Sequence, residues 1–171
     1  MAEKSTKHYS SIQEKMVAKE LGGYQVGGSG AFPTAPGDVT TYEWLIECKT
    51  HTEPGHTIFF DLDVWKKIQQ EAMAMHRKPV LIVDDGSQSV DKTWCLCRSA
   101  NLNKASIIAT PFPRAIRKNV SAKHEVLRDE LEKATKRYIG EFFQGGVYEF
   151  DWGGETVNLM PLTVFKEIFE K

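Results

Sequence analysis

The sequence contains few cysteines and no long hydrophobic run. Three cysteines among 171 residues do not form a disulfide framework, and Cys95 and Cys97 have no second Cys/His pair at the spacing of a zinc site. No apolar stretch reaches the length of a membrane span, and residues 1–11 are polar, without the apolar segment of a secretory signal. We therefore expect a reduced, cytoplasmic protein that does not insert into a membrane.

A net positive charge is also missing. The chain has 22 Lys and Arg against 23 Asp and Glu, whereas a protein that binds nucleic acid usually shows a basic surface. The charges are unevenly distributed, because the segment 114–137 has eight basic and four acidic residues. A second basic group near the N-terminus consists of Lys4, Lys7, His8, Lys15 and Lys19. Both groups fit nucleic-acid contacts, and both also fit a solvated helix surface with i,i+4 ion pairs.

Length and composition predict a single α/β domain over residues 1–171. Apolar residues make up 41% of the chain and charged residues 26%, which is ordinary for a globular domain with its own core. Periodicity and turn residues predict helices at 11–21, 60–77 and 161–169 and strands at 24–26, 40–46, 80–83, 92–98, 147–152 and 155–159. Turn and capping residues also predict a helix from 121 to about 143.

Two carboxylates and one ammonium form the most informative motif of the chain. Asp38 follows a Pro-Gly turn signal, and Glu47 and Lys49 come nine and eleven residues later. Side chains alternate along a strand, so Glu47 and Lys49 should share one face while Cys48 points to the other and joins the core. A hairpin-like return would bring both carboxylates to one end of the sheet. Such a set can hold Mg²⁺ and position a water, although the same pattern also occurs on solvated hairpins.

The segments around this motif make it more specific. They are QEK (13–15), LGG (21–23), GSGA (28–31), PGDV (36–39), LIECK (45–49) and KPVL (78–81). With them, residues 8–85 resemble the PD-(D/E)xK nuclease superfamily and, within it, the Holliday junction resolvases of the archaeal and phage type. The resemblance implies a restriction-endonuclease-like fold, which is a central mixed β-sheet flanked by helices, with a core of about 8–100 and 146–171 and a helical insertion at 101–145. It also implies a metal-dependent, structure-selective endonuclease that resolves four-way DNA junctions by phosphodiester hydrolysis.

The resemblance assigns roles to individual residues. Glu14, Asp38 and Glu47 match acidic metal ligands, the backbone carbonyl of Cys48 is a further ligand, and Lys49 matches the catalytic lysine. The implied cofactor is Mg²⁺, and Mn²⁺ should substitute for it. Taken alone, Glu14 would be read as an ordinary surface charge on a helix.

The implied partner is branched double-stranded DNA. Ser29 matches a loop serine near the scissile phosphate, so it is a catalytic and DNA-binding candidate, although a serine between glycines is also ordinary turn chemistry. Further candidate DNA contacts are Lys15, Arg114, Arg117 and Lys118. A homodimer would place two sites on opposing strands of a junction, and a phage-encoded enzyme would act in the host cytoplasm.

Three points leave alternatives open. The family often has an arginine shortly before the Gly-Ser loop, where this chain has Gln25 and Gly27, so a phosphate contact is lost or moved. Another PD-(D/E)xK endonuclease, of restriction, flap or repair type, would share the metal site. A non-catalytic DNA-binding module on the same fold is the alternative from another class, and the complete set of acids and lysine argues against it.

Overall fold

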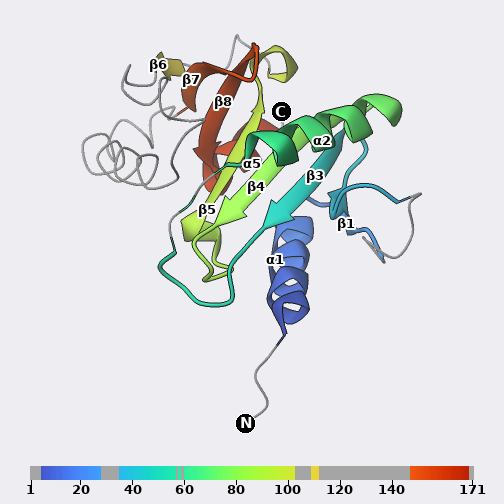
Figure 1. Ribbon diagram of the computed structural model, residues 1–171, viewed down its shortest axis with the longest axis vertical. Coiled ribbons are helices and arrows are strands. Elements are labelled where there is room, and N and C mark those ends of the chain that lie inside the picture. Colours follow the sequence, from blue (N-terminus) through green and yellow to red (C-terminus); the bar gives the residue numbers. More distant parts are fainter. Residues whose placement is uncertain are drawn as a thin grey trace.

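Helices cover both faces of one sheet in the computed structural model of the protein (Figure 1). The structure describes residues 5–27, 35–56, 58, 60–102, 109–111 and 147–169. The helices are α1 (Thr6–Glu20), α2 (Leu62–Ala74) and α5 (Leu162–Phe169), with two short 3₁₀ turns, η1 (Val90–Lys92) and η2 (Ser99–Asn101). The strands are β1 (Tyr24–Gln25), β2 (Val39–Thr40), β3 (Trp44–Lys49), β4 (Lys78–Asp84), β5 (Thr93–Arg98), β6 (Ala109–Pro111), β7 (Val147–Trp152) and β8 (Glu155–Pro161).

The eight described strands form one mixed sheet in the order β1-β2-β3-β4-β5-β8-β7-β6. Strands β1, β2 and β3 are antiparallel neighbours, whereas β3 and β4 are parallel. A parallel pair needs a crossover connection, and α2 supplies it. Strands β4, β5, β8 and β7 then pair antiparallel, and β6 lies parallel to β7. The sheet confirms the predicted α/β class.

Helix α2 packs on one face of the sheet because one side of it is apolar. Its buried residues Trp65, Ile68 and Ala72 recur at helical spacing and contact the inward face of the central strands. The helix begins at Asp61, whose carboxylate accepts hydrogen bonds from two backbone N–H groups of the first turn. This cap fixes the start of α2 close to the end of β3.

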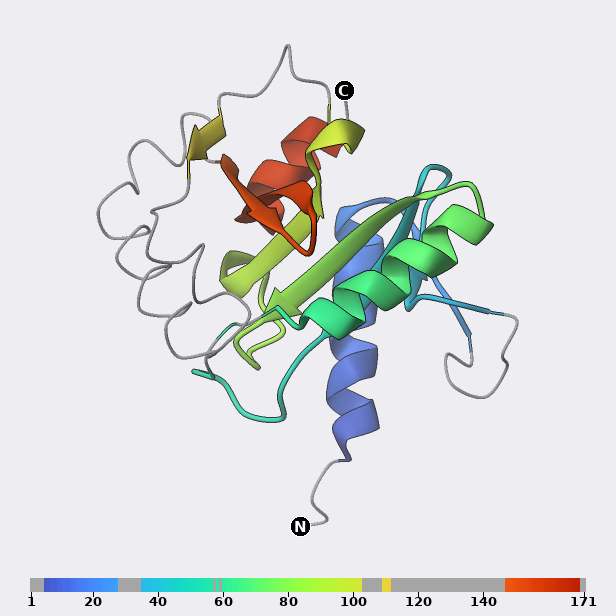
Figure 2. The same ribbon diagram turned by 45° about the horizontal axis from the view of Figure 1, so that its top comes forward.

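Helices α1 and α5 cover the opposite face, as Figure 2 shows from a second angle. Val17 of α1 and Phe165 of α5 pack with Ile46, Cys48 and Ile82, which alternate along β3 and β4 with residues that face α2. Both central strands are therefore buried on both faces, as the apolar run 80–83 predicted. None of the described helices is long and apolar enough to cross a bilayer.

The predicted strand at 40–46 is wrong. Strand β2 ends at Thr40 and β3 begins at Trp44, with a tight turn between them. Thr41 closes this turn, because its N–H donates to the Trp44 carbonyl at 3.0 Å and its Oγ1 accepts from the Trp44 N–H at 3.1 Å. Tyr42, at the tip, is 96% exposed. The residues of this segment favour β-strands, so the sequence pattern did not reveal the turn. The turn forms because the Thr41 side chain bonds to the local backbone.

The other predicted core elements are confirmed with small shifts of their ends. These are the helices α1, α2 and α5 and the strands β1, β4, β5, β7 and β8. Glycines 153 and 154, both at positive φ, form the turn of the β7–β8 hairpin, as predicted. Most of the predicted insertion, including its helix from 121 to 143, lies outside the described residues.

Candidate active site

The β2–β3 hairpin places Asp38 beside the end of β3. The Asp38 N–H donates to the Ile46 carbonyl at 2.8 Å, and the Asp38 Oδ2 accepts from the Cys48 N–H at 2.8 Å. Gly37, just before it, has a φ of 77°, and a Cβ there would lie 2.8 Å from a Leu45 side-chain carbon. Only glycine fits this approach without strain. The Pro-Gly-Asp sequence therefore serves to bring a carboxylate against the backbone of β3.

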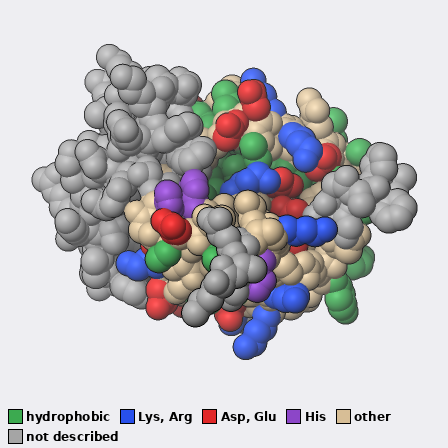
Figure 3. All heavy atoms as spheres, turned by 60° about the horizontal axis from the view of Figure 1, so that its bottom comes forward, with side chains coloured by type: hydrophobic (Ala, Val, Ile, Leu, Met, Phe, Trp, Pro, Cys, Tyr) green, Lys and Arg blue, Asp and Glu red, His purple; other side chains and the backbone are tan. Residues whose placement is uncertain are grey.

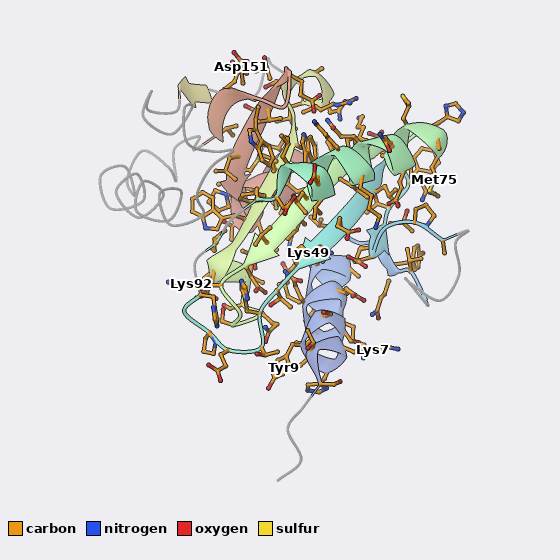
Figure 4. All side chains as sticks on the ribbon, in the orientation of Figure 1. Lys7, Tyr9, Lys49, Met75, Lys92 and Asp151 are labelled. Carbon is orange, nitrogen blue, oxygen red and sulfur yellow. The ribbon has the colours of Figure 1, made fainter. Side chains whose placement is uncertain are left out.

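Glu47 and Lys49 point to the same face of β3, as predicted. The Lys49 Nζ donates to Glu47 Oε1 at 2.5 Å, with Glu47 only 6% exposed and Lys49 half exposed at the strand end. Figure 4 shows Lys49 at the end of β3 nearest α1. Cys48 is buried with the core on the other face, so its thiol is a packing group.

Helix α1 joins this site through two neighbouring residues. The Gln13 Nε2 donates to the Lys49 backbone carbonyl at 2.8 Å, which ties α1 to the end of β3. The next residue, Glu14, is 9% exposed, and its Oε2 accepts from Gln25 Nε2 of β1 at 2.5 Å. Glu14 thus lies under the sheet edge rather than in solvent, which excludes the simple surface-charge interpretation.

The carboxylates and the lysine act on one another electrostatically. Burial raises the pKa of Glu14, the charges of Asp38 and Glu47 add to the rise, and the Gln25 hydrogen bond and the Lys49 charge offset part of it. Burial acts to lower the pKa of Lys49, but the hydrogen bond and charge of Glu47, together with Asp38, outweigh it, so this pKa lies above its ordinary value. The side chains of Glu14, Asp38, Glu47 and Lys49 therefore interact electrostatically at one site.

The charges of these carboxylates also act on the thiol of Cys48. Burial raises its pKa well above the ordinary value, and the charges of Asp38, Glu14 and Glu47 raise it further. A neutral, buried thiol is a poor metal ligand. The donors in the site are therefore carboxylate oxygens and backbone carbonyls, which suit a hard cation such as Mg²⁺.

The three acids are each turned to a protein partner. Glu14 accepts from Gln25, Asp38 from a backbone N–H, and Glu47 from Lys49. In the part of the chain that the structure describes, no group of three or more His, Cys, Asp or Glu side chains is arranged so that it could hold a metal ion. The donor chemistry fits a hard cation, whereas a coordination shell requires these side chains to turn toward one another.

The candidate DNA contacts are only partly described. Lys15 is exposed on α1 directly after Glu14, and Lys7, His8 and Lys19 are exposed on the same helix. Ser29, Arg114, Arg117 and Lys118 lie outside the described residues, as does Lys4. In Figure 3, basic and acidic side chains adjoin hydrophobic ones and histidines on one face of the molecule.

Two residues of the site were missed at the sequence level. Gln13 is fully buried and Gln25 bonds to Glu14, although Gln25 was noted only as a departure from the family pattern. A signal for Gln13 was present, because it lies four residues before Val17 on the apolar side of the helix. A polar residue on such a stripe needs a buried partner, and the Lys49 carbonyl is that partner.

A buried polar network holds the segment that follows Lys49. Asp84, at the end of β4, is 0% exposed and its Oδ1 accepts from Thr50 Oγ1 at 2.5 Å and from the Gly86 N–H at 2.8 Å. The Gln88 Nε2 donates to Thr50 Oγ1 at 2.8 Å and to the His51 carbonyl at 3.0 Å. Asp84 therefore stabilises the turn after β4 and also fixes the residue next to Lys49.

Comparisons with known proteins give no relative for this chain. No protein-family model, no curated protein and no solved structure matches it. The site geometry and the sheet topology are therefore the grounds for a functional assignment.

Proposed function

We propose that this protein is a metal-dependent DNA endonuclease with a restriction-endonuclease-like fold, and that it cuts branched DNA such as four-way junctions. One observation carries the proposal. Glu14, Asp38, Glu47 and Lys49 come from a helix and a hairpin far apart in sequence, and they meet at the end of β3, where the charges of Asp38 and Glu47 raise the pKa of both Glu14 and Lys49. Metal-dependent hydrolysis of a phosphodiester needs this combination of acids and an ammonium.

The order of elements supports the fold assignment. A helix, an antiparallel three-stranded meander, a crossover helix and a parallel strand follow one another, as the QEK, PGDV, LIECK and KPVL segments lead one to expect. The acids lie on α1, before β2 and on β3 within this framework. A non-catalytic module would have no need for three mutually repelling carboxylates at a partly buried site.

Glu14, Asp38 and Glu47 would hold Mg²⁺ or Mn²⁺. The backbone carbonyl of Cys48 is a further candidate, since the N–H and C=O of one strand residue point to the same edge and the N–H meets Asp38. When bound, the cation supplies positive charge for the attacking water and for the leaving 3′ oxygen, so that cleavage leaves a 5′ phosphate. It would also relieve the repulsion among the three carboxylates.

Lys49 acts as a fixed positive charge in this scheme. The hydrogen bond and charge of Glu47, together with the charge of Asp38, raise its pKa above the ordinary lysine value in the metal-free protein, so it carries an ammonium there. Its ammonium can donate hydrogen bonds to the attacking water or to a phosphate oxygen and stabilise charge that develops there. The bond to Glu47 and the Gln13 bond to its carbonyl position Lys49 for this role.

The exposed basic residues of α1 suit contacts to the DNA backbone. Lys7, Lys15 and Lys19 lie on the helix that carries Glu14, so they can position a strand on the site without reading its sequence. A homodimer with two such sites would match the two-fold symmetry of a four-way junction.

The test compares cleavage of a four-way junction, a flap and a linear duplex in Mg²⁺. Wild type should cut the branched substrates, and Asp38→Asn and Lys49→Met should still bind the junction while losing several orders of magnitude in cutting rate. Asp85→Asn, which also changes an aspartate beside a turn, is the matched control and should cut normally. If Asp38→Asn cuts as fast as the wild type, the proposed site is wrong. If the wild type cuts linear duplex in preference to branched DNA, the proposed substrate is wrong.

A further inference from the structure

A pocket of about 220 Å³ lies beside Lys49 on the face of the sheet that α2 covers. It is lined by Lys49, Thr50, His51, Asp61, Val64, Leu81 and Val83. Lys49 ends β3 and the next two residues follow it, Asp61 caps α2 and Val64 lies in its first turn, and the last two residues belong to β4. The pocket is thus formed by three elements that meet at the candidate active site.

The floor of the pocket adjoins two residues of the site directly. In the parallel β3–β4 register, Leu81 pairs with Glu47 and Val83 pairs with Lys49. Paired residues on neighbouring strands point to the same face and lie about 5 Å apart. Whatever occupies the pocket therefore lies next to the ammonium of Lys49 and to the Glu47 that this ammonium contacts.

The walls are mainly apolar, and the polar groups among them already have partners. Leu81 and Val83 form an apolar floor, and Val64 contributes from α2. The Asp61 Oδ1 accepts from backbone N–H groups of its own helix, and Thr50 Oγ1 donates to Asp84. Such a pocket selects its occupant by shape and by apolar faces rather than by hydrogen bonds.

The size of the pocket suits a small occupant. Its volume of about 220 Å³ lies below the roughly 300–1,000 Å³ of typical ligand sites, as expected for a single ring system. Apolar walls beside a cation match a nucleobase, which has two apolar faces and is linked through its deoxyribose to a phosphate.

We propose that this pocket receives one unstacked nucleobase of the strand that is cut. The proposal rests on the nuclease function above and names the feature of DNA that this site selects. Taking a base out of an intact duplex costs free energy, and the cost is smaller where pairing and stacking are already interrupted. Base pairs at a branch point lack a continuous stack on one side, whereas those inside a linear duplex are stacked on both sides. The pocket therefore contributes to the preference for branched DNA.

The first test changes the substrate and uses the wild-type protein. Four-way junctions with a single abasic nucleotide, placed in turn at each position around the cut, are compared with the intact junction under single-turnover conditions. Because the abasic nucleotide lacks the base that would occupy the pocket, one abasic position should slow cutting by roughly 5- to 150-fold, with neighbouring positions little affected. Equal cutting rates at every abasic position overturn the proposal.

The second test fills the pocket from the protein side. Val64→Trp places a bulky ring in the pocket, and Gln70→Trp places the same ring at an exposed position of α2. With 2-aminopurine at the sensitive nucleotide, wild type and Gln70→Trp should raise its fluorescence on binding, and Val64→Trp should not. Thermal melting checks that each variant folds. If Val64→Trp destroys the fold, the abasic series still decides.

Failure of this proposal is distinct from failure of the nuclease function. If the wild type cuts junctions and Asp38→Asn does not, while Val64→Trp keeps the full preference for branched over linear DNA, the site is a nuclease and the pocket does not select its substrate. If no DNA is cut at all, both proposals fail.

Discussion

The Asp38 carboxylate accepts a hydrogen bond from the Cys48 backbone N–H, with 2.8 Å between Oδ2 and N. This bond joins the residue before β2 to the end of β3, so Asp38 has a structural role as well as its proposed chemical one. An asparagine side chain also carries an oxygen that can accept this bond. Asp38→Asn therefore removes the charge while it keeps the hairpin, which is why it is the preferred variant for cleavage experiments.

Neutralising Glu14 should have opposite effects on stability and on activity. Its pKa is raised chiefly by burial, so the ionised form is less stable in the folded than in the unfolded protein. This cost is absent below about pH 4 and fully present above the raised pKa. In metal-free protein at pH 7, Glu14→Gln should raise the melting temperature and keep the bond from Gln25, while junction cutting is lost.

Glu20→Gln on the same helix is the control for Glu14→Gln. Glu20 forms a partly exposed ion pair with Lys166 at 3.0 Å, and such pairs contribute about 0–1 kcal/mol. Its neutralisation should leave cutting unchanged and lower the melting temperature slightly or not at all. A Glu14→Gln variant that melts below the wild type at pH 7 contradicts the electrostatic account of this residue.

The stability of the protein should fall as pH rises through the pKa of Asp84. Burial raises this pKa, and the hydrogen bonds from Thr50 and from the Gly86 and Gln88 backbones offset part of the rise. A carboxyl with a raised pKa in the fold costs nothing below its unfolded pKa of about 4. It destabilises the fold progressively as pH increases beyond that value. Asp84→Asn keeps a side-chain oxygen that can accept the hydrogen bond from Thr50.

Urea unfolding from pH 4 to pH 8 measures this effect. Asp84→Asn should remove part of the decline in unfolding free energy that the wild type shows. Asp85→Asn, which removes only the smaller contribution of the Asp85 charge to the raised pKa of Asp84, should keep most of the decline. Identical pH profiles for Asp84→Asn and wild type would show that Asp84 does not titrate as its buried position implies.

Two glycines at positive φ should differ strongly in their tolerance of alanine. Gly22 has a φ of 62° and open space around a Cβ, so Gly22→Ala should cost about 1–2 kcal/mol of backbone strain. Gly86 has a φ of 94°, and a Cβ there would lie 1.8 Å from the Glu53 carbonyl oxygen. Gly86→Ala must displace the loop after Lys49, so it should cost roughly 2 kcal/mol more than Gly22→Ala. Equal melting temperatures contradict this packing.

Much of the core could be predicted from sequence because periodicity reports burial directly. The run 80–83 and the stripe of α2 with Trp65 and Ile68 identified a central strand and its covering helix. The exception was the turn after Thr40, where β-forming residues conceal a bend that Thr41 stabilises through its own hydrogen bonds. Propensity cannot reveal such a choice between local and sheet bonding.

The candidate site was predicted only in its charged residues. Spacing, strand alternation and the turn signal before Asp38 predicted that Asp38, Glu47 and Lys49 lie together, and a resemblance in short segments added Glu14. The supporting bonds of Gln13 and Gln25 depend on how α1 packs against the end of β3, which no local pattern contains. The pocket beside Lys49 was missed for the same reason, since three separate elements form it.

The central claim is that Glu14, Asp38 and Glu47 together bind a divalent cation. The most direct measurement is Mn²⁺ binding to metal-free protein, followed through the EPR signal of the free ion, for wild type and for Glu47→Gln. Wild type should bind Mn²⁺, and Mg²⁺ should displace it. Glu47→Gln should bind at least about tenfold more weakly, since a lost ligand charge costs more than about 1.4 kcal/mol. Equal Mn²⁺ affinity in the two proteins, or no binding by wild type, would contradict the claim.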